Sequence, residues 1–251
     1  MMHKLTRRIL ATRLNQLIFG AKLDVRESWE KTPADYKKMV DFLNWFDRTN
    51  SVEEAVERGR IDWSYRFASG RFYANVEKNT ALEIGFGAGR LLMHAARDFK
   101  TAIRVDIHAN YPMSEAFLAS QGVNNARLLK RDELALLPDN SVEFVYSFIV
   151  FQHFDGLDEV EFYLNHISRL LAPQGIAQIY YGKRNADGIE VTTADRFKLR
   201  DCSLFIAPET MREIVSSRFE LMDYRDNLAR DAVANTGESV QAMVAFRNRL
   251  A

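Results

Sequence analysis

The sequence predicts an α/β fold built on a mostly parallel sheet with helices on both faces. Between residues 79 and 182, short β-branched runs alternate with helical stretches of about three turns, the pattern of right-handed crossovers between parallel strands. A glycine-rich loop joins the first of these strands directly to a helix. The last two strands lie close together in the chain, as an antiparallel pair at one edge of a sheet would.

The expected sheet has seven strands, of which the last is antiparallel. Apolar runs place the strands at Thr80–Gly85, Thr101–Ile107, Asn125–Leu129, Val142–Phe151, Ile176–Tyr181, Phe219–Tyr224 and Ser239–Phe246. Helical periodicity places the accompanying helices at Arg90–Phe99, Met113–Gln121, Leu157–Leu171 and Pro208–Arg218.

The first part of the chain predicts helices and no strong strand. We expect an N-terminal helical extension over residues 1–78 and one compact domain over residues 79–251. Apolar side chains at helical spacing predict helices at Ala34–Arg48 and Ser51–Arg58, and Ser51-Val-Glu-Glu54 is a capping-box pattern. Met2–Phe19 has the pattern of a basic amphipathic helix. Docking on the domain or on a partner subunit is the favoured interpretation, and contact with an anionic membrane surface is the weaker one.

Composition narrows the class of protein. Lys and Arg number 34 and Asp and Glu number 34, so there is no basic excess and no nucleic-acid partner is expected. The single cysteine, Cys202, cannot form an internal disulfide and lacks a catalytic signature, which favours a structural thiol. No apolar run approaches the roughly 18–20 residues of a membrane span, and no signal-peptide core is present. A cytoplasmic location is therefore expected.

The glycine loop Gly85-Phe-Gly-Ala-Gly89 is placed to bind a ligand beyond the end of the first strand. A dinucleotide fingerprint starting at Gly85 would require Gly or Ala at position 90, where this chain has Arg90. Glu83 stands two residues before the first glycine. A carboxylate there is unfavourable beside a pyrophosphate and favourable beside an α-ammonium group. The alternative is that Glu83 is a solvated residue at a strand end.

Asp106 ends the second strand, 21 residues after Gly85. A carboxylate at this place can accept hydrogen bonds from both ribose hydroxyls. Dinucleotide enzymes use the same contact, so Asp106 indicates an adenosine ligand without choosing among such ligands. The alternative is an exposed aspartate with no ligand.

Five segments together resemble the successive motifs of the class I S-adenosylmethionine-dependent methyltransferases, in particular the small-molecule group. The segments are Glu83–Gly89, Asp106, Leu137-Pro-Asp-Asn-Ser-Val-Glu-Phe-Val-Tyr-Ser147, Phe151-Gln-His153 and Leu170-Leu-Ala-Pro-Gln-Gly175. The resemblance covers about residues 79–182. It implies a Rossmann-like fold and S-adenosylmethionine as the methyl donor. The chain departs from the family pattern at Glu143, usually Asp, and at Gln174, usually Gly.

The resemblance also implies which residues hold the cofactor. Glu83 and the glycines face its methionine end, Asp106 holds the ribose, and Ile107 packs on the adenine. The acid at the adenine edge is assigned to Asp132, with Arg131 and Glu133 as alternatives because the spacing to Leu137-Pro138 is one residue short. The full set of expected cofactor-binding residues is Glu83, Gly85, Gly87, Gly89, Asp106, Ile107, Asp132 and Phe148.

The chemistry requires alignment more than activation, because a sulfonium donor already carries a positive charge. His153, just past the fourth strand, is the candidate base for an acceptor that must lose a proton; the alternative is that it shapes the pocket or caps Asp155. His108 is expected in the cofactor wall. No metal-ligand spacing is recognised among His108, His153 and Asp155, so no metal is expected.

Acceptor recognition is expected from segments outside the motifs. Ile61–Gly70 is expected to lie over the cofactor as a lid, with Trp63, Tyr65 and Arg66 able to contact ligands, although aromatic residues at such a junction also commonly pack. The connector Gly182–Ala207 is basic. It suits an anionic acceptor if it lies beside the site, and is otherwise a solvated loop.

Three classes of function remain open from the sequence. The favoured one is methyl transfer to a small molecule such as a sugar, a glycan or a small acid. The second is a nicotinamide-dependent oxidoreductase, because the strand, glycine loop and ribose acid are shared. The third is a non-catalytic partner subunit that binds S-adenosylmethionine.

Overall fold

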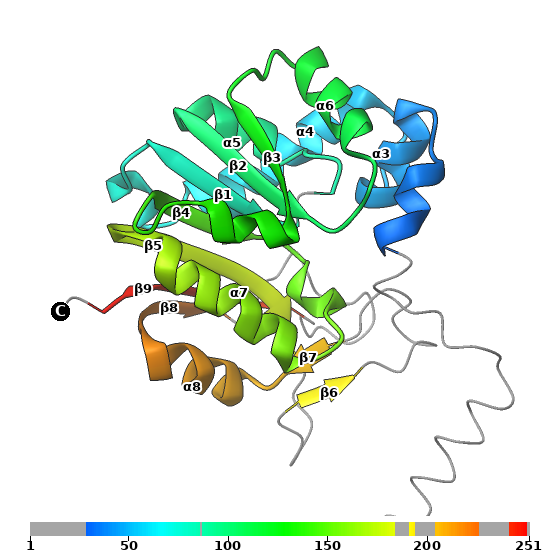
Figure 1. The fold of residues 1–251 in the computed structure, drawn as a ribbon. Coiled ribbons are helices and arrows are strands. Elements are labelled where there is room, and N and C mark those ends of the chain that lie inside the picture. Colours follow the sequence, from blue (N-terminus) through cyan, green and yellow to red (C-terminus); the bar gives the residue numbers. More distant parts are fainter. Residues whose placement is uncertain (1–28, 86, 184–190, 194–203, 226–240, 250–251) are drawn as a thin grey trace, which may run out of the picture.

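The computed structural model describes residues 29–85, 87–183, 191–193, 204–225 and 241–249, which form a twisted sheet flanked by helices (Figure 1). The seven strands have the order β3-β2-β1-β4-β5-β9-β8. β9 is antiparallel to both of its neighbours, and the other pairings are parallel. The strands are β1 Thr80–Ile84, β2 Thr101–Asp106, β3 Ala126–Lys130, β4 Val142–Ser147, β5 Leu171–Gly182, β8 Phe219–Arg225 and β9 Gln241–Asn248. The predicted fold class is confirmed.

Helices cover both faces of the sheet, with α7 and α8 on one face and α4 and α5 on the other (Figure 1). The helices are α3 Met39–Asp47, α4 Val52–Asp62, α5 Leu92–Asp98, α6 Tyr111–Ser120, α7 Leu157–Leu170 and α8 Pro208–Arg218. A π-helix, η2, follows α4 directly at Trp63–Ala68. The short 3-10 helices are η1 Thr32–Asp35, η3 Tyr73–Asn75, η4 Arg131–Leu136 and η5 Phe151–His153.

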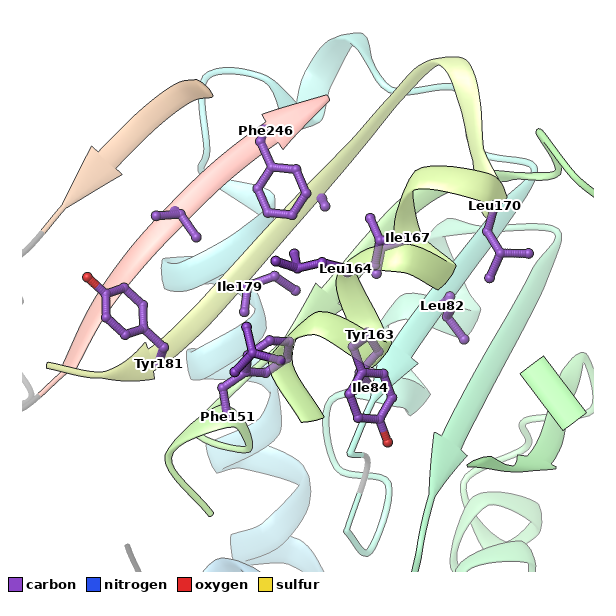
Figure 2. Packing of buried hydrophobic residues seen from close by; sticks show 14 of the residues in the cluster. Leu82, Ile84, Phe151, Tyr163, Leu164, Ile167, Leu170, Ile179, Tyr181 and Phe246 are labelled. Atoms are coloured by element: carbon purple, nitrogen blue, oxygen red, sulfur yellow. The ribbon is translucent and has the colours of Figure 1, made fainter. Parts of the chain in front are cut away.

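The face of the sheet under α7 carries the largest group of buried aliphatic side chains, with some aromatic rings among them. Leu82 and Ile84 of β1 point to this face because alternate strand residues share a side. Leu164 and Ile167 of α7 lie against them, and all four side chains are nearly inaccessible to solvent (Figure 2). Burial of such side chains stabilises the fold by roughly 1.5–3 kcal/mol each. α7 is thereby held with its N-terminal end at the carboxyl edge of the sheet.

The opposite face is aromatic. Phe144 and Tyr146 of β4 pack against Trp63 and Phe67 of η2, with ring centroids 5.1 Å apart for both Trp63–Tyr146 and Phe67–Tyr146. The Trp63 indole nitrogen donates to Asp98 over 2.9 Å. The expectation that Trp63 belongs to a lid over the cofactor is therefore wrong, because its large apolar ring is buried in this layer.

The helix predicted at Ala34–Arg48 begins later, at Met39. Tyr36 and Lys38 are extended, and the Asn110 side chain donates to the carbonyls of Pro33 and Tyr36. These bonds occupy carbonyl groups that a continuous helix would use. Val40, an apolar residue of this stretch, is 42% exposed.

Other boundaries moved for identifiable reasons. The fourth strand ends at Ser147 rather than Phe151, because Ile149 has a positive φ of 54° that interrupts an extended chain. The fifth strand starts at Leu171 rather than Ile176, since Leu171 pairs with Val142. The connector contains a short antiparallel pair, β6 Val191–Thr193 with β7 Leu204–Ile206, that the polar pattern did not predict. Met2–Phe19 and Cys202 lie outside the described residues.

Gly59 is the point of closest approach between α4 and the segment that follows the glycine loop. A Cβ at Gly59 would lie 2.3 Å from the Arg90 carbonyl oxygen, which is backbone and cannot rotate away. We expect Gly59→Ala to lower the free energy of unfolding by about 1–3 kcal/mol, although glycine to alanine inside a helix ordinarily raises it by about 1 kcal/mol. Urea denaturation measures the change. The control is Gly156→Ala, where nothing lies within 4 Å and the backbone is extended. An unchanged or raised stability of Gly59→Ala would contradict the close contact.

Candidate functional site

A cavity opens at the carboxyl ends of β1, β2 and β4, where open α/β sheets bind ligands. It holds about 980 Å³ of space, including the part open to solvent. Most of the predicted site residues meet there. Those lining it are Glu83, Gly85, Gly87, Asp106, Ile107, Phe148 and His153. Gly89 is not among the lining residues, and Asp132 lines an adjoining hollow with Asp106 and Ile107.

Glu83 is buried at the end of β1, with 2% of its surface exposed. It lies beside Tyr146 of β4 and Arg104 of β2 in the strand register, and the Tyr146 hydroxyl donates to its Oε2 over 3.1 Å. Burial raises the pKa of Glu83 well above its usual 4.5, although Tyr146, Arg90 and Arg104 act in the opposite direction. The solvated alternative for Glu83 is thus excluded. A buried acid of this kind is prepared to receive a cation.

The glycine loop turns back over Asp106. Gly87 has a φ of +54° and donates its backbone N–H to Asp106 Oδ2 over 3.0 Å. Asp106 Oδ1 accepts the N–H groups of Ile107 and His108 at 2.6 and 3.3 Å. These bonds orient the carboxylate at the cavity wall. Among the described residues, Oδ2 accepts only the Gly87 bond, so its second lone pair can accept from a ligand hydroxyl.

His108 contacts the glycine loop and lines the hollow that adjoins the cavity. Its Nε2 lies 2.9 Å from the Gly87 carbonyl oxygen, and its Nδ1 accepts the Asn110 backbone N–H over 3.2 Å. The second contact requires an unprotonated Nδ1, so Nε2 carries the proton and donates to Gly87. Burial lowers the pKa of His108, which favours this neutral form.

Arg90 joins the glycine loop to the N-terminal extension. Its Nε donates to Asp47 Oδ1 of α3 over 2.5 Å, and its Nη1 donates to Asp62 Oδ2 of α4 over 2.6 Å. All three side chains are largely buried. Burial opposes the charge of Arg90, but the two carboxylates outweigh it and raise the pKa of Arg90. Arg90 and Asp47 both line the cavity.

Two aromatic residues of the extension cover the cavity. The Phe46 ring packs on the loop, since a Cβ at Gly87 would lie 2.9 Å from its Cδ1. Trp29 lies 5.9 Å from Phe46 and 4.8 Å from His153, measured between ring centroids. The extension therefore covers the site through Trp29 and Phe46. Tyr65, expected to contact a ligand, is 45% exposed and is not a lining residue.

Arg66 is one layer removed from the cavity. Its guanidinium lies 4.2 Å from the centroid of the Phe148 ring, and Phe148 lines the cavity. Arg66 also pairs with Asp62 over 3.2 Å. Arg66 itself is not a lining residue, because Phe148 lies between it and the cavity. The expected contact of Arg66 with a ligand is therefore not supported.

The three candidates for the adenine-edge residue are in different environments. Arg131 pairs with Glu159 over 2.9 Å, and Glu133 accepts the Lys130 backbone N–H over 2.6 Å. The Asp132 side chain is 91% exposed, with Arg131 3.5 Å away. The carboxylate of Asp132 is therefore more accessible than that of Glu133, and it lines the adjoining hollow with Asp106 and Ile107.

His153 lies in the half-buried turn η5 and lines the cavity. Ile149, a β-branched residue with φ of 54°, stands between the end of β4 and this turn. Such a conformation is costly for isoleucine and is found mainly where surrounding structure enforces it, often at functional sites. It redirects the chain so that Phe148, Val150 and His153 all border one space.

Sequence patterns missed several lining residues. These are Trp29, Phe46, Asp47, Leu91, Phe154, Asp155, Glu159 and Tyr163. An acid, Asp47, directly after an apolar helical stripe was the available signal for one of them. The basic residues Arg184, Arg196, Lys198 and Arg200 of the connector lie outside the described residues.

The described part of the chain lacks two features of other protein classes. No helix there has the length and apolar character needed to cross a membrane. Within the same ranges, no three His, Cys, Asp or Glu side chains are grouped as metal ligands.

Comparisons with known proteins agree with this geometry. Residues 82–179 match the family model described as a methyltransferase domain. No match was found among curated protein sequences. The [4+2]-cyclase SpnF is similar in structure at 14% identity, with a TM-score of 0.57, covering 79% of this chain and 82% of that one.

Two further solved structures are similar at comparable levels. The 1,6-didemethyltoxoflavin-N1-methyltransferase of Burkholderia thailandensis, solved with S-adenosylhomocysteine, has 16% identity and a TM-score of 0.55, covering 78% of this chain and 84% of that one. A Pyrococcus horikoshii protein, PH0226, has 15% identity and a TM-score of 0.57, covering 83% and 96%. At these identities the likeness shows the fold. Residues 82–179 therefore have both the sequence pattern of a methyltransferase domain and the fold shared by these solved structures.

Proposed function

We propose that this chain transfers a methyl group from S-adenosylmethionine to a small-molecule acceptor in the cavity beside the glycine loop. The observation that carries the proposal is the placement of two acids on one cavity wall, the buried Glu83 and the half-buried Asp106, with Gly85 and Gly87 between them. Glu83 suits an α-ammonium group and Asp106 suits ribose hydroxyls. Ile107 and Phe148 supply flat apolar contact for the adenine, and Asp132 accepts at its edge.

The residues of the chain act mainly by alignment. When bound, S-adenosylmethionine supplies an already activated methyl group, so in-line displacement depends on how the acceptor is held. The glycine loop and Asp106 fix the donor end. Trp29, Phe46 and Phe154 add aromatic rings to the lining of the cavity, and these rings exclude water.

His153 is the proposed general base. It borders the cavity within the turn that follows β4, and an imidazole can remove a proton near neutral pH. This role applies to a hydroxyl acceptor or another acceptor that must lose a proton. Shaping of the pocket through the contact with Trp29 is the alternative role.

The described wall near His153 carries Asp155 and Glu159 as well as aromatic rings, and this does not favour the anionic acceptor expected from the basic connector. A small acceptor with an apolar face fits the aromatic lining. A cytoplasmic location stays a prediction.

The oxidoreductase alternative is disfavoured by Arg90. A third glycine in a dinucleotide site allows close packing of the helix on the strand. Here that place is filled by an arginine with two ion pairs to the extension. A methyltransferase fold can also support other reactions, as the cyclase SpnF illustrates, so turnover must be measured directly.

Ligand binding separates donor classes. We expect S-adenosylhomocysteine at 100 times its dissociation constant to stabilise the protein by about 2.7 kcal/mol in a thermal melt, and NAD to have no effect. Asp106→Asn should remove most of the stabilisation, because it weakens the acceptor of the ribose hydroxyls while retaining a side-chain oxygen for the loop. Glu53→Gln, an exposed acid on α4, is the control. A melting shift with NAD alone would refute the assignment.

Glu83 makes the free protein less stable at neutral pH. Its raised folded pKa means that stability is fully present below the unfolded value near 4.5 and is lost as pH rises through the folded value. Glu83→Gln keeps an acceptor for Tyr146 without a charge. We expect it to raise the free energy of unfolding at pH 7 and to weaken S-adenosylhomocysteine binding.

Denaturant melts at several pH values test this expectation. The gain from Glu83→Gln should shrink as pH falls toward the unfolded value. A variant that is less stable than the wild type at pH 7, or a gain independent of pH, would show that Glu83 is already compensated in the free protein.

His153→Ala tests the base. We expect turnover to fall by about 10²–10⁴-fold while the affinity for S-adenosylhomocysteine is retained. Release of homocysteine from a coupled hydrolase, measured over an acceptor panel, follows the reaction. An active His153→Ala enzyme would assign His153 to pocket shaping only.

A further inference from the structure

Asp47 carries an oxygen that the protein itself leaves without a hydrogen bond. Its Oδ1 accepts from Arg90, but its Oδ2 is buried and has no partner among the described residues. A buried polar atom left without a partner costs roughly 1–3 kcal/mol in folded proteins. The side chain is 8% exposed, and Asp47 lines the cavity that also contains Glu83, Gly85 and Gly87.

Asp62, the other carboxylate that pairs with Arg90, can be compared with Asp47. Asp62 also accepts from Arg90, over 2.6 Å, but Asp62 is not among the residues that line the cavity. Its Oδ1 accepts from Arg66 over 3.2 Å. Asp62 therefore has both oxygens occupied, whereas Asp47, a residue that lines the cavity, has one occupied oxygen and one buried oxygen without a partner among the described residues.

The position of Asp47 follows from how α3 meets the glycine loop. Phe46 packs on Gly87, and the next residue, Asp47, binds Arg90 directly after the loop. Glu83 interacts electrostatically with the same arginine. Asp47 and Glu83 thus approach the amino-acid end of the proposed cofactor site from different elements.

We propose that Asp47 is a second carboxylate receptor for the α-ammonium group of the cofactor, supplied by the N-terminal extension. An ammonium group has three N–H donors and is poorly satisfied by one acid in a buried site. Glu83 accepts one of these donors and Asp47 Oδ2 accepts another. This inference rests on the proposed function and extends it, because it assigns a cofactor contact outside the segment that matches the family.

Burial of Asp47 is consistent with this role. It raises the pKa of Asp47, and the charge of Arg90 opposes the increase. The groups that face Asp47 are Arg90 and Arg58, which favour its charge, and Asp62, which disfavours it. An incoming ammonium group adds a further cation at the oxygen that no described residue satisfies.

The test compares two ligands in two variants. S-adenosylhomocysteine carries the amino-acid end, and 5′-methylthioadenosine keeps the adenosine and thioether but lacks it. We expect Asp47→Asn to weaken the binding of S-adenosylhomocysteine by about 10–100-fold in titration calorimetry, which is the effect of losing a charged hydrogen bond. The affinity for 5′-methylthioadenosine should stay unchanged. Asp62→Asn is the matched control, because it removes a carboxylate from the same arginine and should leave the ratio of the two affinities unchanged.

Other outcomes would overturn the inference. An unchanged affinity ratio in Asp47→Asn would limit Asp47 to holding Arg90. If both variants lose the preference for S-adenosylhomocysteine over 5′-methylthioadenosine, the carboxylates act by positioning Arg90 and not by binding the ammonium group. If Asp47→Asn fails to fold, Asp47→Ser, which keeps an acceptor for Arg90, takes its place. A wild-type protein that binds neither ligand would instead refute the proposed function itself.

Discussion

The arrangement of the site depends on the buried guanidinium of Arg90 and its two carboxylates. The bonds to Asp47 and Asp62 connect the segment after the glycine loop to α3 and α4. Breaking one partner of a buried ion pair generally costs about 3–5 kcal/mol, since the other charge is left uncompensated. The extension is therefore not an independent appendage. It is part of the wall of the site, and Gly59 permits the close approach that the ion pairs need.

A second connection acts on the same loop from the other side. His108 holds the Gly87 carbonyl, its Nδ1 accepts from Asn110, and the Asn110 side chain holds the carbonyls of Pro33 and Tyr36. The loop is thus attached to the extension twice, through charge at Arg90 and through neutral hydrogen bonds at His108. Neutral bonds persist at high salt, and a buried ion pair is screened much less than a surface one. We therefore expect salt to affect these contacts less than it affects ion pairs at the surface.

Local patterns predicted the parts of the fold that local interactions determine. The helix Pro208–Arg218 has the predicted bounds, and Thr80–Ile84 and Thr101–Asp106 end within one residue of prediction. The predictions were wrong where contacts with residues distant in the sequence determine the local structure. The helix start at Met39 depends on Asn110, far along the chain, and no pattern within residues 34–48 contains that information.

The site residues fall into the same two groups, those that local patterns predict and those that distant contacts position. Glu83, Gly85, Gly87 and Asp106 lie at or just after the ends of strands, and the edge of a parallel sheet brings strand ends together whatever the rest of the chain does. Trp29 and Asp47 reach the cavity only through the packing of α3, which the sequence does not specify locally. Trp63 shows the reverse error, because an aromatic residue suited to a lid is equally suited to the layer against Phe144 and Tyr146.

The electrostatics of β1 explain why a stable fold retains a costly residue. Glu83 shares its face of the sheet with Ala81 and the aromatic layer, where an aliphatic side chain would pack without penalty. Its neighbours Tyr146 and Arg104 reduce the cost of its burial but do not remove it, since its pKa remains raised. The cost of burying the charge of Glu83 is only partly offset in the free protein, and a bound cation would offset the rest. A protein selected only for stability would not keep an acid at this position, so the composition of the strand end is itself an argument for a cationic ligand.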